Sequence, residues 1–219
     1  MKLAAWTRLL ALSLCSLAAQ AAGPFGYPAT GETLLRTILS RPAAQLEKAR
    51  TLQGTFRQSR HLRELARPLI ATGEFVFARD LGVYWHTTQP FDSVIVFNEA
   101  GMMQIDEGAT ALRMSADEQP AVRLIGNLFT ALFTLDVTRL GKDFDLYGIR
   151  EGMRWTIGLK PRASTIADVI RHVTVMGSDD VEQVELVDAQ GERTVLELGT
   201  IQYSGDAPRE EVRALLSGR

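Results

Sequence analysis

The chain of 219 residues has one cysteine and three histidines, and these shortages remove whole classes of function. His61, His86 and His172 have no second histidine or cysteine at metal-ligand spacing, so we expect no zinc site. The sequence also lacks a G-x-S-x-G elbow, a P-loop and a dinucleotide-binding fingerprint. Because no nucleophile, base and orienting group come together, we predict a protein that is not an enzyme and needs neither metal nor cofactor.

The charge pattern argues against a nucleic-acid partner. Lysine and arginine total 24 against 26 acidic residues, which gives a formal net charge of −2. The basic residues form no cluster of the kind that neutralises phosphates. We therefore expect no nucleic acid among the partners.

The N-terminal residues have the pattern of a cleaved export signal. Lys2 and Arg8 precede the short apolar run LLALSLCSL at 9–17, and AQA at 19–21 offers small residues at the −3 and −1 positions. The run is too short to span a bilayer. We expect a signal peptide at 1–21 and one domain at 22–219. Removal of the signal also removes Cys15, so the exported chain would have neither disulfide nor thiolate chemistry.

The stretch GEFVFARDLGVYWHTTQP at 73–90 reads as two strands with a charged corner between them. Side chains alternate along a strand, so large apolar residues of both strands share one face. They are Phe75, Phe77, Val83 and Trp85. Arg79 ends this row on the same face, where a charged side chain needs a polar partner.

Period-two patterns predict about ten consecutive antiparallel strands. We expect them near residues 52–58, 69–79, 83–89, 91–97, 102–105, 144–149, 153–159, 169–176, 181–187 and 194–203. Gly191 should supply a positive φ in the turn between the last two strands. Residues 23–31 are rich in glycine and proline and read as a flexible lead-in.

Helical spacing appears at three places outside these strands. Residues 33–49 carry one apolar stripe, which Pro42 should divide into two short helices, with Ser40 placed to cap the second. A broad stripe covers 121–133, where we expect Asp117 and Glu118 to act as caps or to favour the helix dipole. A short helix should then run from Leu135 and end at Gly141. A terminal helix is expected at 208–216, with Leu215 and Leu216 docked.

The fold class is therefore mainly β (α+β), with an antiparallel sheet whose apolar face needs a cover. The helices at 33–49 and 121–133 have the apolar stripes for that role. The sheet could close on them as a dry core, or it could leave space for a greasy ligand. Residue patterns alone leave both possibilities open.

Several motifs occur in one order along the strands, and together they resemble a known family. They are Phe56-Arg57-Gln58, Gly73 to Arg79, Trp85 to Pro90, and Val94 to Gly101. The chain is similar to the LolA-like periplasmic carriers of outer-membrane lipoproteins, of the LolA/LolB superfamily, as a divergent LolA-related subfamily. Asp80 departs from the family pattern, which has a proline after the arginine.

The resemblance implies an incomplete, strongly curved antiparallel β-barrel with a helical lid over a hydrophobic cavity for acyl chains. It also implies that Arg79 holds the lid by hydrogen bonds to backbone carbonyls, a role suited to the five donors of a guanidinium. We expect two sets of side chains to line the cavity, one on the sheet and one on the lid. They are Phe75, Phe77, Val83 and Trp85, and Leu128, Phe129, Leu132 and Phe133.

The implied function is that of a monomeric periplasmic carrier that shields the acyl chains of a lipoprotein between the inner and the outer membrane. Its partners would be the acylated lipoprotein, an inner-membrane donor and an outer-membrane acceptor. One alternative is a carrier of another lipid, such as a glycolipid, a polyene lipid or a fatty acid. Another is a lipoprotein-sensing regulatory module, which would form a stable complex with a protein and transfer no lipid. A hydrolase is a third, disfavoured by the missing nucleophile.

Overall fold

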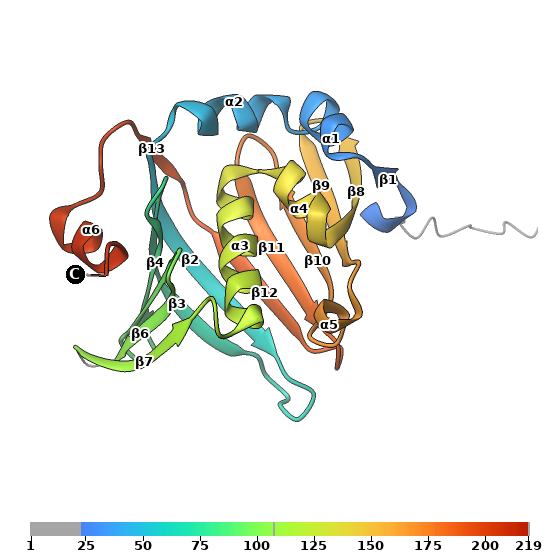
Figure 1. Ribbon diagram of the computed structural model, residues 1–219. Coiled ribbons are helices and arrows are strands. Elements are labelled where there is room, and N and C mark those ends of the chain that lie inside the picture. The colour runs from blue at the N-terminus through green and yellow to red at the C-terminus, as the bar shows by residue number, and fades with distance from the viewer. Residues whose placement is uncertain (1–22, 107, 219) are drawn as a thin grey trace, which may run out of the picture.

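The computed structural model describes residues 23–106 and 108–218, and its core is one antiparallel sheet of 13 strands. The sheet curls around helix α3 (Pro120–Thr134), while helices α1 (Gly31–Thr37) and α2 (Ser40–Lys48) cross one open end (Figure 1). The strand order β1-β8-β9-β10-β11-β12-β2-β3-β4-β5-β6-β7 begins and ends at unpaired edges, with β13 on β2. The predicted open, curved antiparallel sheet with a helical cover is thereby confirmed.

The strands follow the predicted meander with several differences in their bounds. The first seven are β1 (Pro28–Ala29), β2 (Thr51–His61), β3 (Leu69–Ala78), β4 (Gly82–Gln89), β5 (Ser93–Asn98), β6 (Gly101–Asp106) and β7 (Ala109–Ser115). The others are β8 (Phe144–Glu151), β9 (Arg154–Pro161), β10 (Ile170–Gly177), β11 (Val181–Asp188), β12 (Arg193–Leu198) and β13 (Gln202–Ser204).

The sequence indicated about ten strands, and the three additional ones have identifiable reasons. Strand β1 has only two residues, inside the segment interpreted as a flexible lead-in. Strand β7 is an edge strand whose residues are mostly exposed, so it shows no apolar alternation. The strand expected at 194–203 is two strands, because the chain leaves β12 at Gly199, whose amide donates to the carbonyl of Thr55, and rejoins β2 as β13.

Pro42 divides the first helical segment as predicted. Helix α1 ends at Thr37, and α2 begins at Ser40 and holds Pro42 in its first turn, where a missing N–H breaks no helical bond. Ser40 is not the cap that the sequence indicated: Leu39 occupies that position, and no side chain caps α2. Helix α1 is capped by Thr30, whose hydroxyl accepts a hydrogen bond from the Thr33 amide at 3.1 Å.

The central helix α3 occupies the predicted place, but its ends differ from the expectation. Its N-cap is Gln119, no side chain caps it, and Asp117 and Glu118 both lie before its first turn. Helix α4 (Val137–Asp143) is capped instead by Asp136, whose carboxylate accepts from the Arg139 amide at 2.9 Å.

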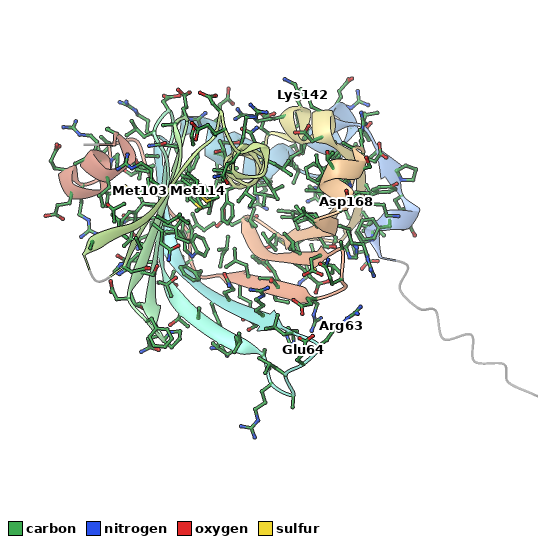
Figure 2. All side chains as sticks on the ribbon, turned by 60° about the horizontal axis from the view of Figure 1, so that its bottom comes forward. Arg63, Glu64, Met103, Met114, Lys142 and Asp168 are labelled. Atoms are coloured by element: carbon green, nitrogen blue, oxygen red, sulfur yellow. The ribbon has the colours of Figure 1, made fainter. Side chains whose placement is uncertain are left out.

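Helix α4 also runs past Gly141, where an end was expected. Gly141 has no positive φ and lies within the helix, which continues to Asp143, so it does not act as the predicted helix end. The loop that carries Arg63 and Glu64, between β2 and β3, projects from the opposite end of the molecule to Lys142 of α4 (Figure 2).

The outer face of the sheet is covered by two segments. Helix α6 (Glu210–Leu216) confirms the expected terminal helix: Val212 and Leu216 are buried against Val76, Ala78 and Val96. The 3-10 helix η1 (Pro24–Gly26) covers β8 to β10, and a short helix α5 (Ser164–Ala167) joins β9 to β10. Neither η1 nor α5 was predicted. The C-terminal half of β3 is buried on both faces, with Phe75 and Phe77 against α3 inside and Val76 and Ala78 against α6 outside.

The corner after Arg79 explains the departure at Asp80. Asp80 has a φ of 69° and Gly82 a φ of 126°, so both lie in the left-handed region. Aspartate tolerates that conformation, whereas proline is fixed near a φ of about −65°. The residue type at this corner therefore follows from the turn that this chain makes.

Candidate functional site: an apolar cavity under two helices

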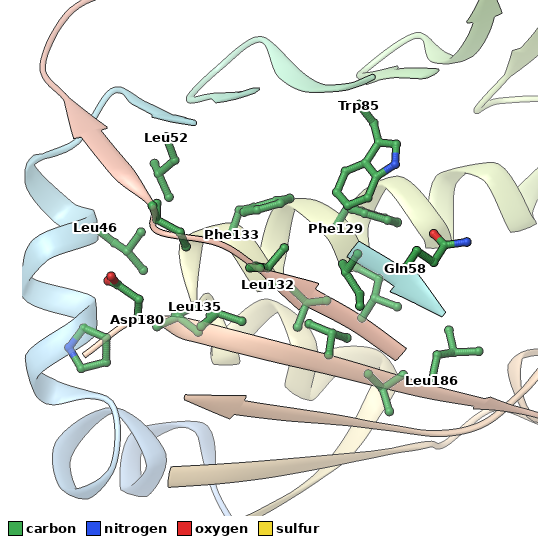
Figure 3. A pocket seen from close by; sticks show the side chains of 18 of the residues that line it. Leu46, Leu52, Gln58, Trp85, Phe129, Leu132, Phe133, Leu135, Asp180 and Leu186 are labelled. Atoms are coloured by element: carbon green, nitrogen blue, oxygen red, sulfur yellow. The ribbon is translucent and has the colours of Figure 1, made fainter. Parts of the chain in front are cut away.

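An apolar cavity of about 220 Å³ lies between α3 and the inner face of the sheet (Figure 3). Helix α2 closes one end of it with Pro42 and Leu46. The remaining apolar side chains come from α3 and its C-cap, from the strands, and from Ile201 between β12 and β13. They are Leu128, Phe129, Leu132, Phe133 and Leu135, and Leu52, Trp85, Val173, Val181, Val184, Leu186, Leu196, Leu198 and Ile201.

Five of the eight side chains expected to line the cavity do line it, namely Trp85, Leu128, Phe129, Leu132 and Phe133. Phe75, Phe77 and Val83 do not. The Phe133 ring lies over Phe75 and Phe77, with centroid distances of 4.9 and 5.7 Å, and so separates them from the cavity. Val83 is fully buried beside them, and Phe77 borders a second cleft on the other side of α3.

Most of the strand residues that line the cavity were not predicted as site residues. Val184 and Leu196 face each other across β11 and β12, and Leu186 and Leu198 continue the same face. These side chains are only partly buried, because they border open space instead of packed atoms. Their alternation was visible in the sequence, but nothing in it indicated that α3 packs over β3 and β4 and leaves β10 to β12 uncovered.

Aromatic rings hold α3 against β2 to β5. Trp85 stacks on Phe56 at 3.8 Å and meets the edge of Phe129 at 5.7 Å, and Phe129 also stacks on Phe97 at 5.4 Å. Such pairs contribute about 0.5–1.5 kcal/mol each beyond their burial. One side of α3 is therefore fastened to the sheet, while the other side borders the cavity.

Arg79 reaches the C-terminal end of α2. Its Nη2 donates to the carbonyl oxygen of Leu46 at 2.6 Å, and its Nε donates to that of Ala49 at 3.2 Å. The last carbonyls of a helix have no partner within the helix and carry partial negative charge, so a guanidinium suits them. Because Leu46 also lines the cavity, these two bonds connect the arginine to the cavity wall.

The other end of α2 has a weaker attachment. Arg41 Nη1 lies 3.2 Å from Asp179 Oδ1 in the turn between β10 and β11, and both side chains are about half exposed or more. An exposed ion pair of this kind contributes about 0–1 kcal/mol. Helix α2 thus spans from that turn to the corner after β3, with its stronger contact at Arg79.

Polar groups occur at both ends of the cavity lining. Next to α2, the Tyr203 hydroxyl donates a hydrogen bond to the Asp180 carboxylate. Burial raises the pKa of Tyr203, and the hydrogen bond to Asp180 and its negative charge raise that pKa further. Gln58 lies at the opposite end (Figure 3), and Thr194 of the lining is on β12, two residues from Leu196, which pairs with Gln58.

A wider cleft of about 910 Å³ lies on the other side of α3, between that helix, α2 and the turns after β3 and β5. Its lining mixes charged and apolar side chains, including Arg79, Asp80, Phe77 and Arg123. Among residues 23–106 and 108–218, no three His, Cys, Asp or Glu side chains are grouped so that they could hold a metal ion. No helix in that part of the chain has the length and apolarity to cross a membrane.

The fold and the cavity define a class: an open, curled antiparallel sheet that encloses an apolar pocket under two helices. The family model described as "Outer membrane lipoprotein carrier protein LolA" matches residues 47–210, about three quarters of the chain. The chain belongs to this family. Helix α1, most of α2 and nearly all of α6 lie outside the matched residues.

Curated relatives are similar at about one residue in four. The outer-membrane lipoprotein carrier protein of Pseudomonas entomophila is 27% identical over 182 residues, which cover 80% of each chain. The protein of the same name from Pseudomonas putida is 26% identical over 155 residues, which cover 68% of this chain and 70% of that one.

Two solved structures align with the chain at low sequence identity. The complex of Pseudomonas aeruginosa MucA and MucB aligns with a TM-score of 0.46 and 16% identity, over 80% of this chain and 58% of that one. A LolA superfamily protein from Nitrosomonas europaea aligns with a TM-score of 0.41 and 11% identity, over 77% of this chain and 95% of that one.

Proposed function

We propose that this protein is a monomeric periplasmic carrier that shields the acyl chains of a lipoprotein between the inner and the outer membrane. The observation that carries the proposal is an apolar cavity whose end is closed by α2, with α2 fastened by Arg79. Membership of the family and the export-signal pattern at 1–21 support it. The partners would be the acylated protein, an inner-membrane donor and an outer-membrane acceptor.

The free energy gained by burying an acyl chain is large enough to open the helical lid of the cavity. A cavity volume of about 220 Å³ is below the range of about 300–1,000 Å³ that is typical of ligand pockets, so an acyl chain has to displace a lid helix, α2 or α3. Burying one methylene contributes about 0.8 kcal/mol, so a chain of about sixteen carbons contributes on the order of 10 kcal/mol. Two hydrogen bonds from a charged donor contribute about 1.5–3 kcal/mol each, so a bound chain outweighs them.

No catalytic step is part of the proposal. The polar groups of the cavity are an amide, a hydroxyl, a carboxylate and a phenol, and the phenol has a raised pKa because it is buried and donates to the carboxylate. A tyrosine that keeps its proton is a poor base. The polar groups therefore suit recognition of a ligand.

The test is native mass spectrometry of the protein purified from the periplasm, followed by lipid extraction. We expect a bound acylated species in the wild-type protein. Leu196→Trp, which fills the cavity, should lose it, and Val195→Trp, one residue away on the other face of β12, should keep it. Recovery of a glycolipid or a fatty acid would favour a carrier of that other lipid. A stable protein complex without lipid would contradict the carrier function and favour a regulatory module.

A further inference from the structure

One ionisable pair stands out in the apolar cavity. Asp180, in the turn before β11, and Tyr203, in β13, both line the cavity beside Pro42 and Leu46 of α2. The Tyr203 hydroxyl donates its proton to the Asp180 carboxylate, and Figure 3 shows Asp180 at the α2 end, away from Gln58. Both side chains are half-buried, so they are accessible from within the cavity.

The negative charge at this end is not neutralised by its neighbours. The nearby guanidinium of Arg41 is paired with Asp179 at 3.2 Å, on the turn but outside the cavity lining. Glu182, two residues further along, accepts from the Ser178 hydroxyl and also lies outside the lining. Asp180 is therefore the one charged group among the residues that line the cavity in the described part of the chain.

The pair offers hydrogen-bond acceptors and no free donor. A carboxylate only accepts hydrogen bonds, and the single proton of a phenol can be donated once. Since Tyr203 donates to Asp180, the remaining lone pairs of both groups face the ligand as acceptors. Burial and the carboxylate raise the pKa of Tyr203, so the phenol keeps that proton at neutral pH.

The distance to the other polar end suits one extended chain. Tyr203 pairs with Leu52 on β2, and Gln58 lies six positions further along the same strand. At about 3.3 Å per residue, the two ends are roughly 20 Å apart. The lining between them is apolar, so a hydrocarbon chain fits between the ends, and a polar head at the α2 end would meet Asp180 and Tyr203.

We propose that Asp180 and Tyr203 form a headgroup subsite that accepts lipids whose polar part donates hydrogen bonds, through an amide, an amine or a hydroxyl, and disfavours lipids that end in a carboxylate. The inference rests on the proposed function and specifies its ligand. A fatty-acid carboxylate would face Asp180 at reduced dielectric, where like charges repel strongly and no donor compensates. An amide or hydroxyl would find acceptors there.

The test measures binding of two palmitoyl probes to the purified protein at pH 7.5, by displacement of a fluorescent fatty-acyl reporter. The probes are N-palmitoylethanolamine, which has an amide N–H and a hydroxyl, and palmitate. We expect the wild-type protein to prefer the first by roughly tenfold, or about 1.4 kcal/mol. Asp180→Asn should reduce this ratio to below about threefold by improving palmitate binding.

Two further variants separate recognition from structure. Glu182→Gln removes one negative charge from the same segment outside the cavity, and it should leave the ratio at the wild-type value. Tyr203→Phe removes the proton that Asp180 receives and should increase the preference for N-palmitoylethanolamine, a change in the direction opposite to that of Asp180→Asn. A loss of packing would weaken both probes together.

The outcomes distinguish the inference from the proposed function. If neither probe nor reporter binds the wild-type protein, the carrier function fails. If all of them bind but the ratio is the same in the wild type, Asp180→Asn and Tyr203→Phe, only the headgroup subsite is overturned. Should Asp180→Asn fail to fold, the ratio in Tyr203→Phe decides alone.

Discussion

The guanidinium of Arg79 lies 2.6 Å from the carbonyl oxygen of Leu46, so a strand end and a helix end far apart in sequence share a charged hydrogen bond. Arg79 follows the buried C-terminal half of β3, and Leu46 belongs to both α2 and the cavity wall. The backbone strengthens this contact, since the Arg79 amide donates to the Arg50 carbonyl at 2.8 Å. Substitution of Arg79 should therefore loosen α2 and the end of the cavity that it closes more than it disturbs strand pairing in the sheet.

Arg79→Leu should increase lipid exchange more than it lowers stability. The two charge-assisted bonds contribute at most about 1.5–3 kcal/mol each, and water replaces part of this at a half-buried arginine, so we expect the free energy of unfolding to fall by about 3 kcal/mol or less. Transfer of a fluorescent acylated peptide between vesicles, together with urea unfolding, measures both effects. Arg113→Leu on the exposed strand β7 is the matched control. Transfer equal to the wild type in Arg79→Leu would contradict the lid hypothesis.

Phe133→Ala should be among the most destabilising changes in the chain. Its ring contacts Phe75 and Phe77 and separates them from the cavity, so truncation leaves a void. We expect a loss of about 3–5 kcal/mol in urea unfolding. Phe91→Ala, at a side chain that is 80% exposed, should stay within about 0.5 kcal/mol of the wild type. Similar losses in the two variants would show that α3 does not pack as described.

Gly73→Ala should prevent β3 and β4 from pairing normally. A Cβ on Gly73 would lie 1.9 Å from the His86 carbonyl oxygen and 2.8 Å from the Phe56 ring. Backbone cannot move aside as a side chain can, so we expect a loss of at least about 3 kcal/mol. Gly152→Ala is the control: no atom lies within 4 Å of its Cβ position, so only the strain of its φ of 64° should lower stability there. A thermal midpoint unchanged in Gly73→Ala would contradict the register of this hairpin.

His172 should make stability depend on pH. Burial, beneath the Phe25 ring at 4.9 Å, lowers the pKa of His172, and the charges of Arg171 and Lys160 also lower it against the opposing effect of Glu185. The unfolded chain then binds more protons than the folded one, so stability is complete above pH about 6.5 and falls as the pH drops below that value.

The corresponding measurement is the thermal midpoint between pH 8 and pH 5. His172→Gln should flatten the decrease below pH 6.5. An equal slope in the wild type and His172→Gln would sink this assignment.

Leu216→Ala should destabilise the outer face of the sheet. Leu216 is 2% exposed and packs with Val76 and Val96, so its truncation is expected to cost about 2–5 kcal/mol. Leu215→Ala changes the same residue type at a half-buried neighbour and should cost less. Equal effects on chemical unfolding would indicate that α6 does not dock through Leu216.

The sequence allowed much of the fold to be predicted, for physical reasons that particular residues illustrate. The alternation in β3 and β4 placed Phe75, Phe77, Val83 and Trp85 on one face, because a strand leaves no other choice. The stripe of α3 indicated a helix for the inner face. Strand β7 could not be predicted, because its exposed edge position imposes no apolar pattern.

The candidate site was less predictable, because it depends on where α3 packs. The apolar face of α3 is broad enough to cover any part of the sheet. Its pattern therefore did not predict that Phe133 would pack on Phe75 and that Val184 would border the cavity. The contact between Asp180 and Tyr203 depends on the exit of the chain from β12 at Gly199 and its return to β2, which no local pattern encodes. The apolar row singled out Arg79, but its contact with a lid helix was expected only from the family resemblance, and its role as a latch stays a prediction.

The double cover of β3, by α3 on one face and α6 on the other, has a mechanical consequence. The backbone of β3 pairs with β2 on one side and with β4 on the other, and Val76 and Ala78 pack under α6. Exchange of these amides should therefore require global unfolding. We expect hydrogen exchange to be slowest here and much faster in α2. The C-terminal half of β3 would then stay fixed when α2 moves. The sheet side of the cavity would keep its shape while α2 opens and closes its end.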